Sequence, residues 1–212
     1  MTMLEIARSR PVVPVIEINN AGDAVPLARA LIAGGIDVIE VTFRTEAAAA
    51  AIAAIRKEVP DMLVGAGTVV TKDQVTRALD LGVAFGVAPG LNPDTIEAFT
   101  KAKVPFMPGI ATASEIEGAL ATGCRMLKFF PAEASGGVAM LKALSGPYAS
   151  LGVRFCPTGG VNPGNMLEYL SLPIVATIGG SWVATKQHIA DGDWDGITAR
   201  AAEALAQAAK AV

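Results

Sequence analysis

Histidine is nearly missing from this chain of 212 residues, because His188 is the only one. A zinc ion that activates a substrate is normally held by several histidine ligands, so one histidine cannot supply such a site. A Ser-His-Asp mechanism would depend on the same residue, and the chain has no Gly-x-Ser-x-Gly turn. His188 stands in a polar stretch, where we expect a surface residue. A carboxylate-only magnesium site would have just Glu17 and Glu40 as candidates, so we predict no metal.

Cysteine is almost as scarce, with only Cys124 and Cys156, each inside an apolar run. Two isolated cysteines provide neither a disulfide framework nor the ligand spacing of a metal site. We therefore expect two small buried hydrophobic residues.

The chain also lacks an excess of charge of one sign and long apolar runs. Charged residues make up 17% of it, the net charge is −3, and no basic block marks a nucleic-acid surface. The apolar stretches are interrupted before they reach the length of a membrane span. The N-terminal residues lack a positive region followed by an apolar core, so they do not form a signal peptide. We expect a cytoplasmic protein with neither nucleic acid nor membrane as a partner.

What the sequence does contain is a regular alternation of short β-branched runs with segments rich in Ala, Leu, Glu and Lys. The runs are mostly apolar throughout, which is typical of parallel strands covered on both faces. Eight strand-helix units predict a closed (β/α)8 TIM barrel of the α/β class, with a doubly wound open sheet as the alternative. No linker divides the chain, so residues 1–212 are expected to form a single barrel domain. The expected strands are Val12 to Ile18, Asp37 to Phe43, Leu63 to Val69, Phe85 to Pro89, Pro105 to Ile110, Arg125 to Phe130, Arg154 to Thr158 and Ile174 to Gly179.

The clearest helical segments are Thr45 to Glu58 and Ile197 to Ala211. The helix after Trp194 is expected either to pack across the last strand or to cap the barrel. Helix starts with capping chemistry are expected at Asp23, at Thr71 with Gln74, at Thr112 with Glu115, and at Asn162 before Pro163.

The most informative single residue is Lys128, which stands in the apolar strand Arg125 to Phe130. Lysine is rarely fully buried without a partner, and a low-dielectric environment favours its neutral amine. A neutral amine condenses with a carbonyl group to give a Schiff base. Glu40 is a second charge inside an apolar strand. The alternatives are a structural lysine that extends its amine to the barrel rim, and a Glu40 that serves only as its ion-pair partner.

Other polar and glycine residues stand at the ends of the expected strands, where the active site of a (β/α)8 barrel lies. Arg44 and Thr68 follow strands two and three, although Arg44 could be a solvated residue and Thr68 a helix cap. The last two strands end in Thr158-Gly159-Gly160 and Gly179-Gly180-Ser181. Glycine loops at these two positions often bind phosphate through backbone N–H groups, with help from a following helix N-terminus.

Five runs together resemble the 2-keto-3-deoxy-6-phosphogluconate (KDPG) and 4-hydroxy-2-oxoglutarate aldolases, from about Pro11 to the C-terminus. The runs are Ile39 to Thr45, Gly65 to Thr68, Lys128 to Glu133, Phe155 to Gly160 and Gly179 to Trp182. The resemblance implies a class I aldolase of the Entner-Doudoroff pathway, a homotrimer of barrels that needs no metal and no cofactor. Its substrates would be small 2-keto-4-hydroxy acids. KDPG would give pyruvate and D-glyceraldehyde 3-phosphate, and 4-hydroxy-2-oxoglutarate would give pyruvate and glyoxylate.

The resemblance also implies roles for individual residues. Lys128 is the Schiff-base lysine and Glu40 the acid/base. The remaining implied contacts are Arg44 and Thr68 for the pyruvate carboxylate, Pro89, Phe130 and Thr158 for the pocket wall, and Gly159, Gly160, Gly180 and Ser181 for the phosphate. Relatives differ in residue type at Glu17, so the choice of C4 configuration and of phosphorylated or unphosphorylated substrate stays open. A non-catalytic phosphosugar-binding barrel and a trimeric assembly scaffold remain the alternatives from other classes.

Overall fold

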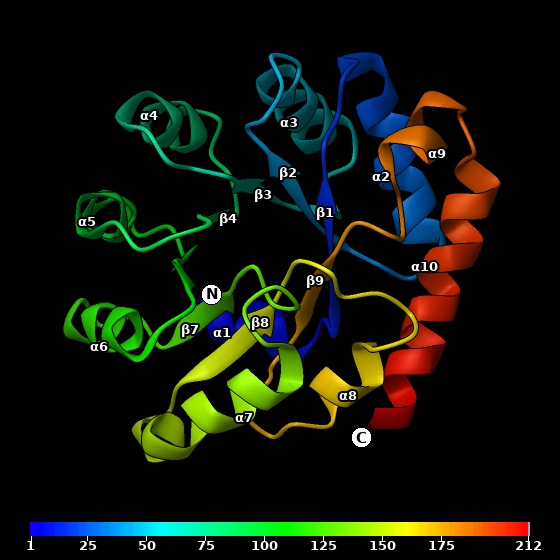
Figure 1. The fold of residues 1–212 in the computed structure, drawn as a ribbon. Coiled ribbons are helices and arrows are strands. Elements are labelled where there is room, and N and C mark those ends of the chain that lie inside the picture. The colour runs from blue at the N-terminus through cyan, green and yellow to red at the C-terminus, as the bar shows by residue number, and fades with distance from the viewer. Residues whose placement is uncertain (212) are drawn as a thin grey trace.

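The computed structural model describes residues 1–211, in which strands and helices alternate along the chain (Figure 1). The strands are β1 (Val12–Ile16), β2 (Val38–Thr42), β3 (Leu63–Gly67), β4 (Phe85–Val87), β5 (Phe106–Met107), β6 (Gly109–Ile110), β7 (Met126–Phe129), β8 (Arg154–Pro157) and β9 (Ile178–Gly180). The α-helices are α1 (Met3–Arg8), α2 (Ala24–Ala33), α3 (Ala48–Glu58), α4 (Lys72–Asp80), α5 (Pro93–Lys101), α6 (Ala113–Ala121), α7 (Gly137–Tyr148), α8 (Met166–Leu170), α9 (Lys186–Ala190) and α10 (Trp194–Ala208). Three short 3-10 helices are η1 (Ala21–Asp23), η2 (Ala149–Leu151) and η3 (Ala209–Ala211).

The strands form a closed parallel barrel, which confirms the predicted fold class and excludes the open sheet. One run of neighbours is β5-β4-β3-β2-β1-β9 and the other is β6-β7-β8. The two groups of strands meet on one side at Pro108. This residue interrupts the expected strand Pro105 to Ile110 and divides it into β5 and β6. On the other side, isolated bridges join Phe155 to Val175 and Thr158 to Gly179. Helices surround the strands (Figure 1).

The expected strand at Ile174 to Gly179 was placed too early, since β9 runs from Ile178 to Gly180. The apolar stretch before it makes only local pairing with β8. There the Phe155 N–H donates to the Ile174 carbonyl at 2.8 Å, and the Ala176 N–H donates to the Phe155 carbonyl at 3.0 Å. Periodicity cannot distinguish such an irregular bridge from a regular strand.

The strands are buried on both faces, as the apolar runs predicted. All five residues of β2 are buried, and Val38, Ile39 and Val41 are fully so. Burial on both faces leaves polar side chains on these strands without solvent, which makes Glu40 and Lys128 stand out.

The first helix was not anticipated by sequence reasoning. Thr2 and Glu5 form a capping box at the start of α1, and Met3, Ile6 and Ala7 are buried. The helix ends just before β1 begins, so it covers the amino-terminal end of the barrel, and in Figure 1 it lies behind the strands. That end is therefore closed, and the opposite end is left for a site.

The helix starts agree only partly with the expected caps. Thr71 with Gln74 and Thr112 with Glu115 form the expected capping boxes. Asp23 makes no side-chain cap on α2, and Asn162 accepts from the Gly164 N–H in a turn ahead of α8.

The two strongest helices also begin at other residues than expected. The segment expected from Thr45 begins its helix at Ala48, and the Thr45 hydroxyl ahead of it donates to the Ile18 carbonyl.

The last helix begins three residues earlier than expected and completes the outer ring. It packs beside α2, where the Thr198 hydroxyl donates to the Ala30 carbonyl at 3.0 Å. A Cβ at Gly34 would lie 2.5 Å from the Ala201 Cβ, so glycine lets the two helices approach.

Candidate active site

The barrel brings together two charges that are 88 residues apart in the chain. Glu40 on β2 and Lys128 on β7 face each other inside the barrel, with Lys128 Nζ 3.2 Å from Glu40 Oε1. Each side chain is only 3% exposed. The lysine is therefore buried and paired, and its amine does not extend to a solvated rim.

Glycine on β3 makes the room that this pair needs. A Cβ at Gly67 would lie 2.2 Å from Glu40 Oε1 and 2.6 Å from its Cγ. Any larger residue would have to displace the carboxylate that faces Lys128. Gly67, the second glycine of the Gly65 to Thr68 run, is thus required by the site itself.

Arg44 and Thr68 form a second contact at the ends of β2 and β3. The Arg44 Nε donates to the Thr68 Oγ1 at 3.1 Å. Thr68 has a φ of 56°, which is unusual for a β-branched residue and stores backbone strain. It does not cap α4, which begins under Thr71, so its hydroxyl serves to hold the guanidinium.

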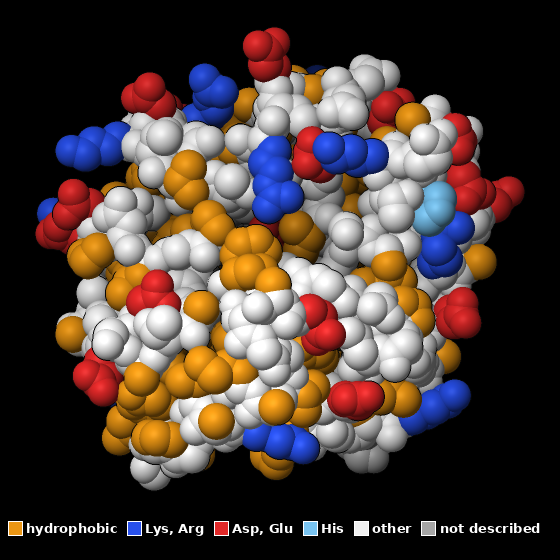
Figure 2. Space-filling model, viewed as in Figure 1, with side chains coloured by type: hydrophobic (Ala, Val, Ile, Leu, Met, Phe, Trp, Pro, Cys, Tyr) orange, Lys and Arg blue, Asp and Glu red, His pale blue; other side chains and the backbone are white. Residues whose placement is uncertain are grey.

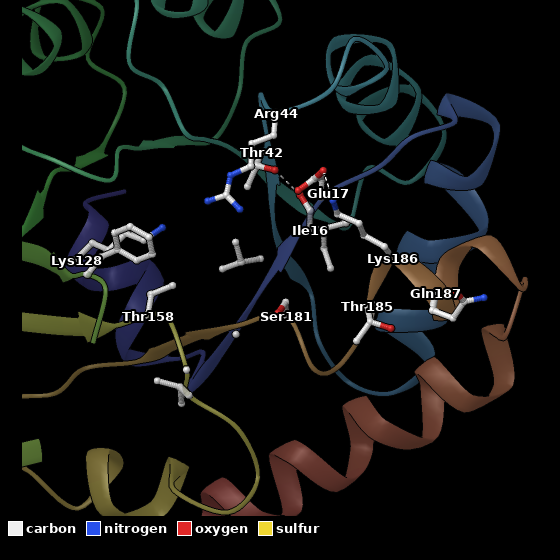
Figure 3. Close-up of a pocket in the computed structure, with 17 residues that line it drawn as sticks. Ile16, Glu17, Thr42, Arg44, Lys128, Thr158, Ser181, Thr185, Lys186 and Gln187 are labelled. Carbon is white, nitrogen blue, oxygen red and sulfur yellow. Dashed lines mark hydrogen bonds and ion pairs between the residues drawn. The ribbon is translucent and has the colours of Figure 1, made fainter. Parts of the chain in front are cut away.

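A cavity of about 460 Å³ opens at the carboxyl ends of the strands (Figure 3). Figure 2 shows charged side chains gathered beside the hollow in the middle of this face. The predicted site residues that line the cavity are Arg44, Lys128, Phe130, Thr158, Gly159, Gly160, Gly180 and Ser181. Segments distant in the sequence thus meet at one end of the barrel.

Three predicted residues do not line this cavity directly. Glu40 and Thr68 lie one residue behind the wall, where each is hydrogen-bonded to a lining residue: Glu40 to Lys128, and Thr68 to Arg44. Pro89 packs beside the barrel strand that holds Gly109, where a Cβ at Gly109 would lie 2.2 Å from the Pro89 carbonyl carbon and oxygen.

The loop after β8 lines the cavity with Gly159, Gly160 and Val161. Gly159 and Gly160 both have positive φ, 96° and 84°, which favours glycine. Within residues 1–211, no hydrogen bond is formed by the backbone N–H of Gly160 or of Val161. The side-chain amides of Asn162 and Asn165 donate to the Gly160 carbonyl, at 2.9 Å and 3.1 Å. The loop therefore has free donors suited to an anion.

The helices after the two glycine loops contribute less than expected. Both α8 and α9 have five residues, and α8 begins six residues after Gly160. The expected help from a helix N-terminus is not met here, so the loops depend on their own N–H groups.

Glu133 supports the same loop from the segment after β7. Its N–H donates to the Gly159 carbonyl at 3.1 Å, and a Cβ at Gly160 would lie 2.5 Å from its Cγ. The Tyr169 hydroxyl donates to the Glu133 carboxylate. Burial, together with this carboxylate, raises the pKa of Tyr169, so the hydroxyl remains a donor.

Cys156 lies opposite Lys128 on the neighbouring strand β8. Burial raises the pKa of its thiol to about 12, and this outweighs the opposing effects of the Thr158 hydrogen bond and of Lys128. The thiol is therefore protonated at neutral pH and does not compete with the amine as a nucleophile. Cys124 is only half-buried, so the expectation of two buried cysteines holds fully for Cys156 alone.

Sequence reasoning missed part of the cavity wall. Lys186 lines the cavity and forms an ion pair with Glu17, which also lines it. The only available signal was that Lys186 follows the Gly180-Ser181 loop closely.

His188 is half-buried, and its backbone N–H donates to the Thr185 hydroxyl in the capping box of α9. No cluster of three or more His, Cys, Asp or Glu side chains suited to a metal ion occurs among residues 1–211. No helix in the same residues has the length and apolar character needed to cross a membrane.

Comparison with known proteins agrees with this geometry. A family model for the KDPG and KHG aldolases matches residues 3–200. The 2-dehydro-3-deoxy-phosphogluconate aldolase of Pseudoalteromonas atlantica is 50% identical, over 94% of this chain and 92% of that protein. The KHG/KDPG aldolase of Escherichia coli K12 is 48% identical, over 94% of this chain and 93% of that protein. The crystal structure of KDPG aldolase from Legionella pneumophila, with pyruvate captured as a covalent carbinolamine intermediate, matches with a TM-score of 0.92 and 43% identity, over 96% of this chain and 98% of that one.

The fold and the cavity define a (β/α)8-barrel protein with a buried lysine in its pocket. The chain belongs to the KDPG and KHG aldolase family. The predicted family is therefore confirmed.

Replacing Gly67 with alanine tests the space around the buried pair. The added Cβ overlaps the Glu40 carboxylate, so we expect Gly67→Ala to lower the free energy of unfolding by about 1–3 kcal/mol, measured by urea denaturation. Gly146→Ala is the matched control, because a Cβ at Gly146 within α7 meets nothing within 4 Å. The control should be neutral or slightly stabilising. Equal stability of the two variants would contradict the packing described for Gly67.

Proposed function

We propose that this chain is a class I aldolase that cleaves KDPG to pyruvate and D-glyceraldehyde 3-phosphate, and 4-hydroxy-2-oxoglutarate to pyruvate and glyoxylate. The observation that carries the proposal is the buried Lys128–Glu40 pair at the base of an open cavity. Buried ion pairs are poor sources of stability, so a chemical role is the better reason for keeping one.

The reaction begins when Glu40 accepts a proton from the Lys128 ammonium and the free amine attacks the C2 ketone. Glu40 returns this proton to the hydroxyl of the resulting carbinolamine, which leaves as water and gives a protonated imine between Lys128 and C2. This cation accepts the electron pair of the C3–C4 bond as the C4 hydroxyl loses its proton to Glu40, directly or through a water molecule. The aldehyde leaves, the enamine takes the proton from Glu40 at C3, and water hydrolyses the protonated imine to release pyruvate and the Lys128 ammonium.

The other residues bind and orient the substrate in this proposal. Arg44, held by Thr68, offers a bidentate match to the carboxylate of the pyruvate portion. Phe130 and Thr158 form the wall beside Lys128, and Lys128 Nζ lies 5.3 Å from the Phe130 ring centroid. The role of Pro89 in the wall would be indirect, through its packing against Gly109. The phosphate is bound by Gly159, Gly160, Gly180 and Ser181.

We also propose that the chain acts as one barrel domain, that the protein is cytoplasmic, and that it assembles as a homotrimer. Of the predicted domain of residues 1–212, Val212 lies outside the described residues. The support for the trimer is the family resemblance. Sedimentation equilibrium should give about three times the chain mass of 21.7 kDa. A monomer mass would reject the trimer, and a much larger mass would favour the scaffold alternative.

Borohydride trapping tests the identity of the nucleophile. Incubation with pyruvate and sodium borohydride should reduce the imine and leave a covalent adduct on Lys128, located by peptide mass spectrometry. The sharpest competitor is Lys186, the other lysine of the cavity wall, which is 58% exposed. An adduct on Lys186, or no adduct, would reject the mechanism. Lys128→Met is the control and should abolish trapping.

Glu40→Gln separates imine formation from proton transfer. The amide keeps the size of the carboxylate but is not a base. Water can still take the Lys128 proton during a long incubation, so we expect the final yield of pyruvate trapping to persist while kcat falls by about 10²- to 10⁴-fold. Steady-state pyruvate release and trapping yield are the measurements. Glu97→Gln, in the exposed pair with Lys101 on α5, is the matched control and should retain activity. Unchanged turnover in Glu40→Gln would remove Glu40 from the mechanism.

A further inference from the structure

The cavity has a second ion pair at the side away from Lys128. Glu17 and Lys186 both line the cavity and pair with each other, as Figure 3 shows. Glu17 follows β1, and Lys186 is the first residue of α9. No role in the reaction described above uses either residue.

The register of the barrel places this pair beside a glycine loop. In the β1–β9 pairing, Pro14 lies opposite Gly180, so the chain continues from there to Glu17 on one side and past Ser181 on the other. Ala184 and Thr185 continue the cavity wall from Ser181 to Lys186. The pair therefore borders the part of the cavity where the proposed function puts the distal phosphate.

The charges of this pair have opposite effects on such a group. A phosphate carries up to two negative charges, so the Glu17 carboxylate alone would repel it, and the Lys186 ammonium would attract it. The Glu17 side chain is 20% exposed and is held close to the wall, whereas Lys186 is 58% exposed on a flexible four-carbon stem. The ammonium is thus the mobile member of the pair.

We propose that Lys186 is a phosphate-binding residue of this chain and that Glu17 is its positioning partner. This inference rests on the proposed aldolase function. Without a ligand, Glu17 holds the ammonium at the edge of the cavity. A phosphorylated substrate competes with Glu17 for the same ammonium, so the pair sets the preference between phosphorylated and unphosphorylated substrates.

The test is a double-mutant cycle read by two measurements. Steady-state KM is measured for KDPG and for 4-hydroxy-2-oxoglutarate, and the affinity for inorganic phosphate is measured by calorimetry. Lys186→Met leaves Glu17 unpaired at the phosphate loop. We expect KM for KDPG to rise at least about tenfold, the size of one lost charge-assisted hydrogen bond, and phosphate affinity to fall similarly. The KM for 4-hydroxy-2-oxoglutarate should rise much less.

The second variant distinguishes the charge of Glu17 from simple packing. Glu17→Gln removes the competitor and should lower KM for KDPG about two- to fivefold. Adding Glu17→Gln to Lys186→Met should recover only the part of the loss that comes from the unpaired carboxylate, because the bond from Lys186 to phosphate is still missing. Full recovery would show that Lys186 only neutralises Glu17, and would reject Lys186 as a phosphate ligand. Lys101→Met, from the exposed pair with Glu97 on α5, is the matched control and should change neither measurement.

The outcomes separate this inference from the proposed function. If the protein releases pyruvate but Lys186→Met changes KM equally for both substrates, or changes neither KM nor phosphate affinity, the Lys186 assignment is wrong. If phosphate binding depends on Lys186 but no pyruvate is released from either substrate, the aldolase proposal is wrong and Lys186 remains a phosphate ligand.

Discussion

The contact between Lys128 and Glu40 is the interaction on which the rest of the site depends. Two opposite charges at 3.2 Å inside an apolar barrel are costly to desolvate, and neither is tolerable without the other. The pairing also solves a chemical problem, because a buried ammonium must lose a proton before it can attack a carbonyl, and the acceptor is already in contact. The same pair therefore explains how the lysine is buried and, in the proposed mechanism, how it would become a nucleophile.

Small residues around the pair let the barrel hold these long side chains. Gly67 leaves room for the Glu40 carboxylate, and a Cβ at Gly179 would lie 2.3 Å from the Thr158 hydroxyl on the cavity wall. Without such positions, a barrel interior is normally filled by branched apolar side chains. Strain enters at Thr68, whose positive φ directs a hydroxyl to Arg44. The strained backbone at Thr68 thus costs some stability but fixes the position of the Arg44 guanidinium, and the surrounding sheet holds Thr68 in this conformation.

Sequence reasoning recovered the barrel and singled out the two charges of the buried Lys128–Glu40 pair because both leave signals along the chain. Apolar runs mark buried parallel strands, and a charge inside such a run is anomalous wherever the strand is placed. The helix α1 was missed because it is short. The residues before β9 were mistaken for part of a strand because they are apolar like one, although they form only an isolated bridge to β8. The ion pair of Glu17 and Lys186 was missed because nothing in the chain shows which exposed residues of different loops meet. Contacts between loops depend on the closure of the barrel, whereas strand patterns are local.

The two ion pairs of the cavity are both Lys–Glu pairs, but they differ in burial. This difference decides how freely each lysine can move and what each pair can do. The 3% exposed pair has one geometry, which suits a reaction that needs an amine and a base at fixed positions. The pair with a 58% exposed lysine is screened by solvent and can exchange partners at small cost. Substitutions that alter only the exposed pair would leave the barrel and the proposed imine chemistry intact. Substrate preference can therefore vary within one scaffold at the rim of the cavity, while the buried end remains fixed by the cost of leaving either of its charges alone.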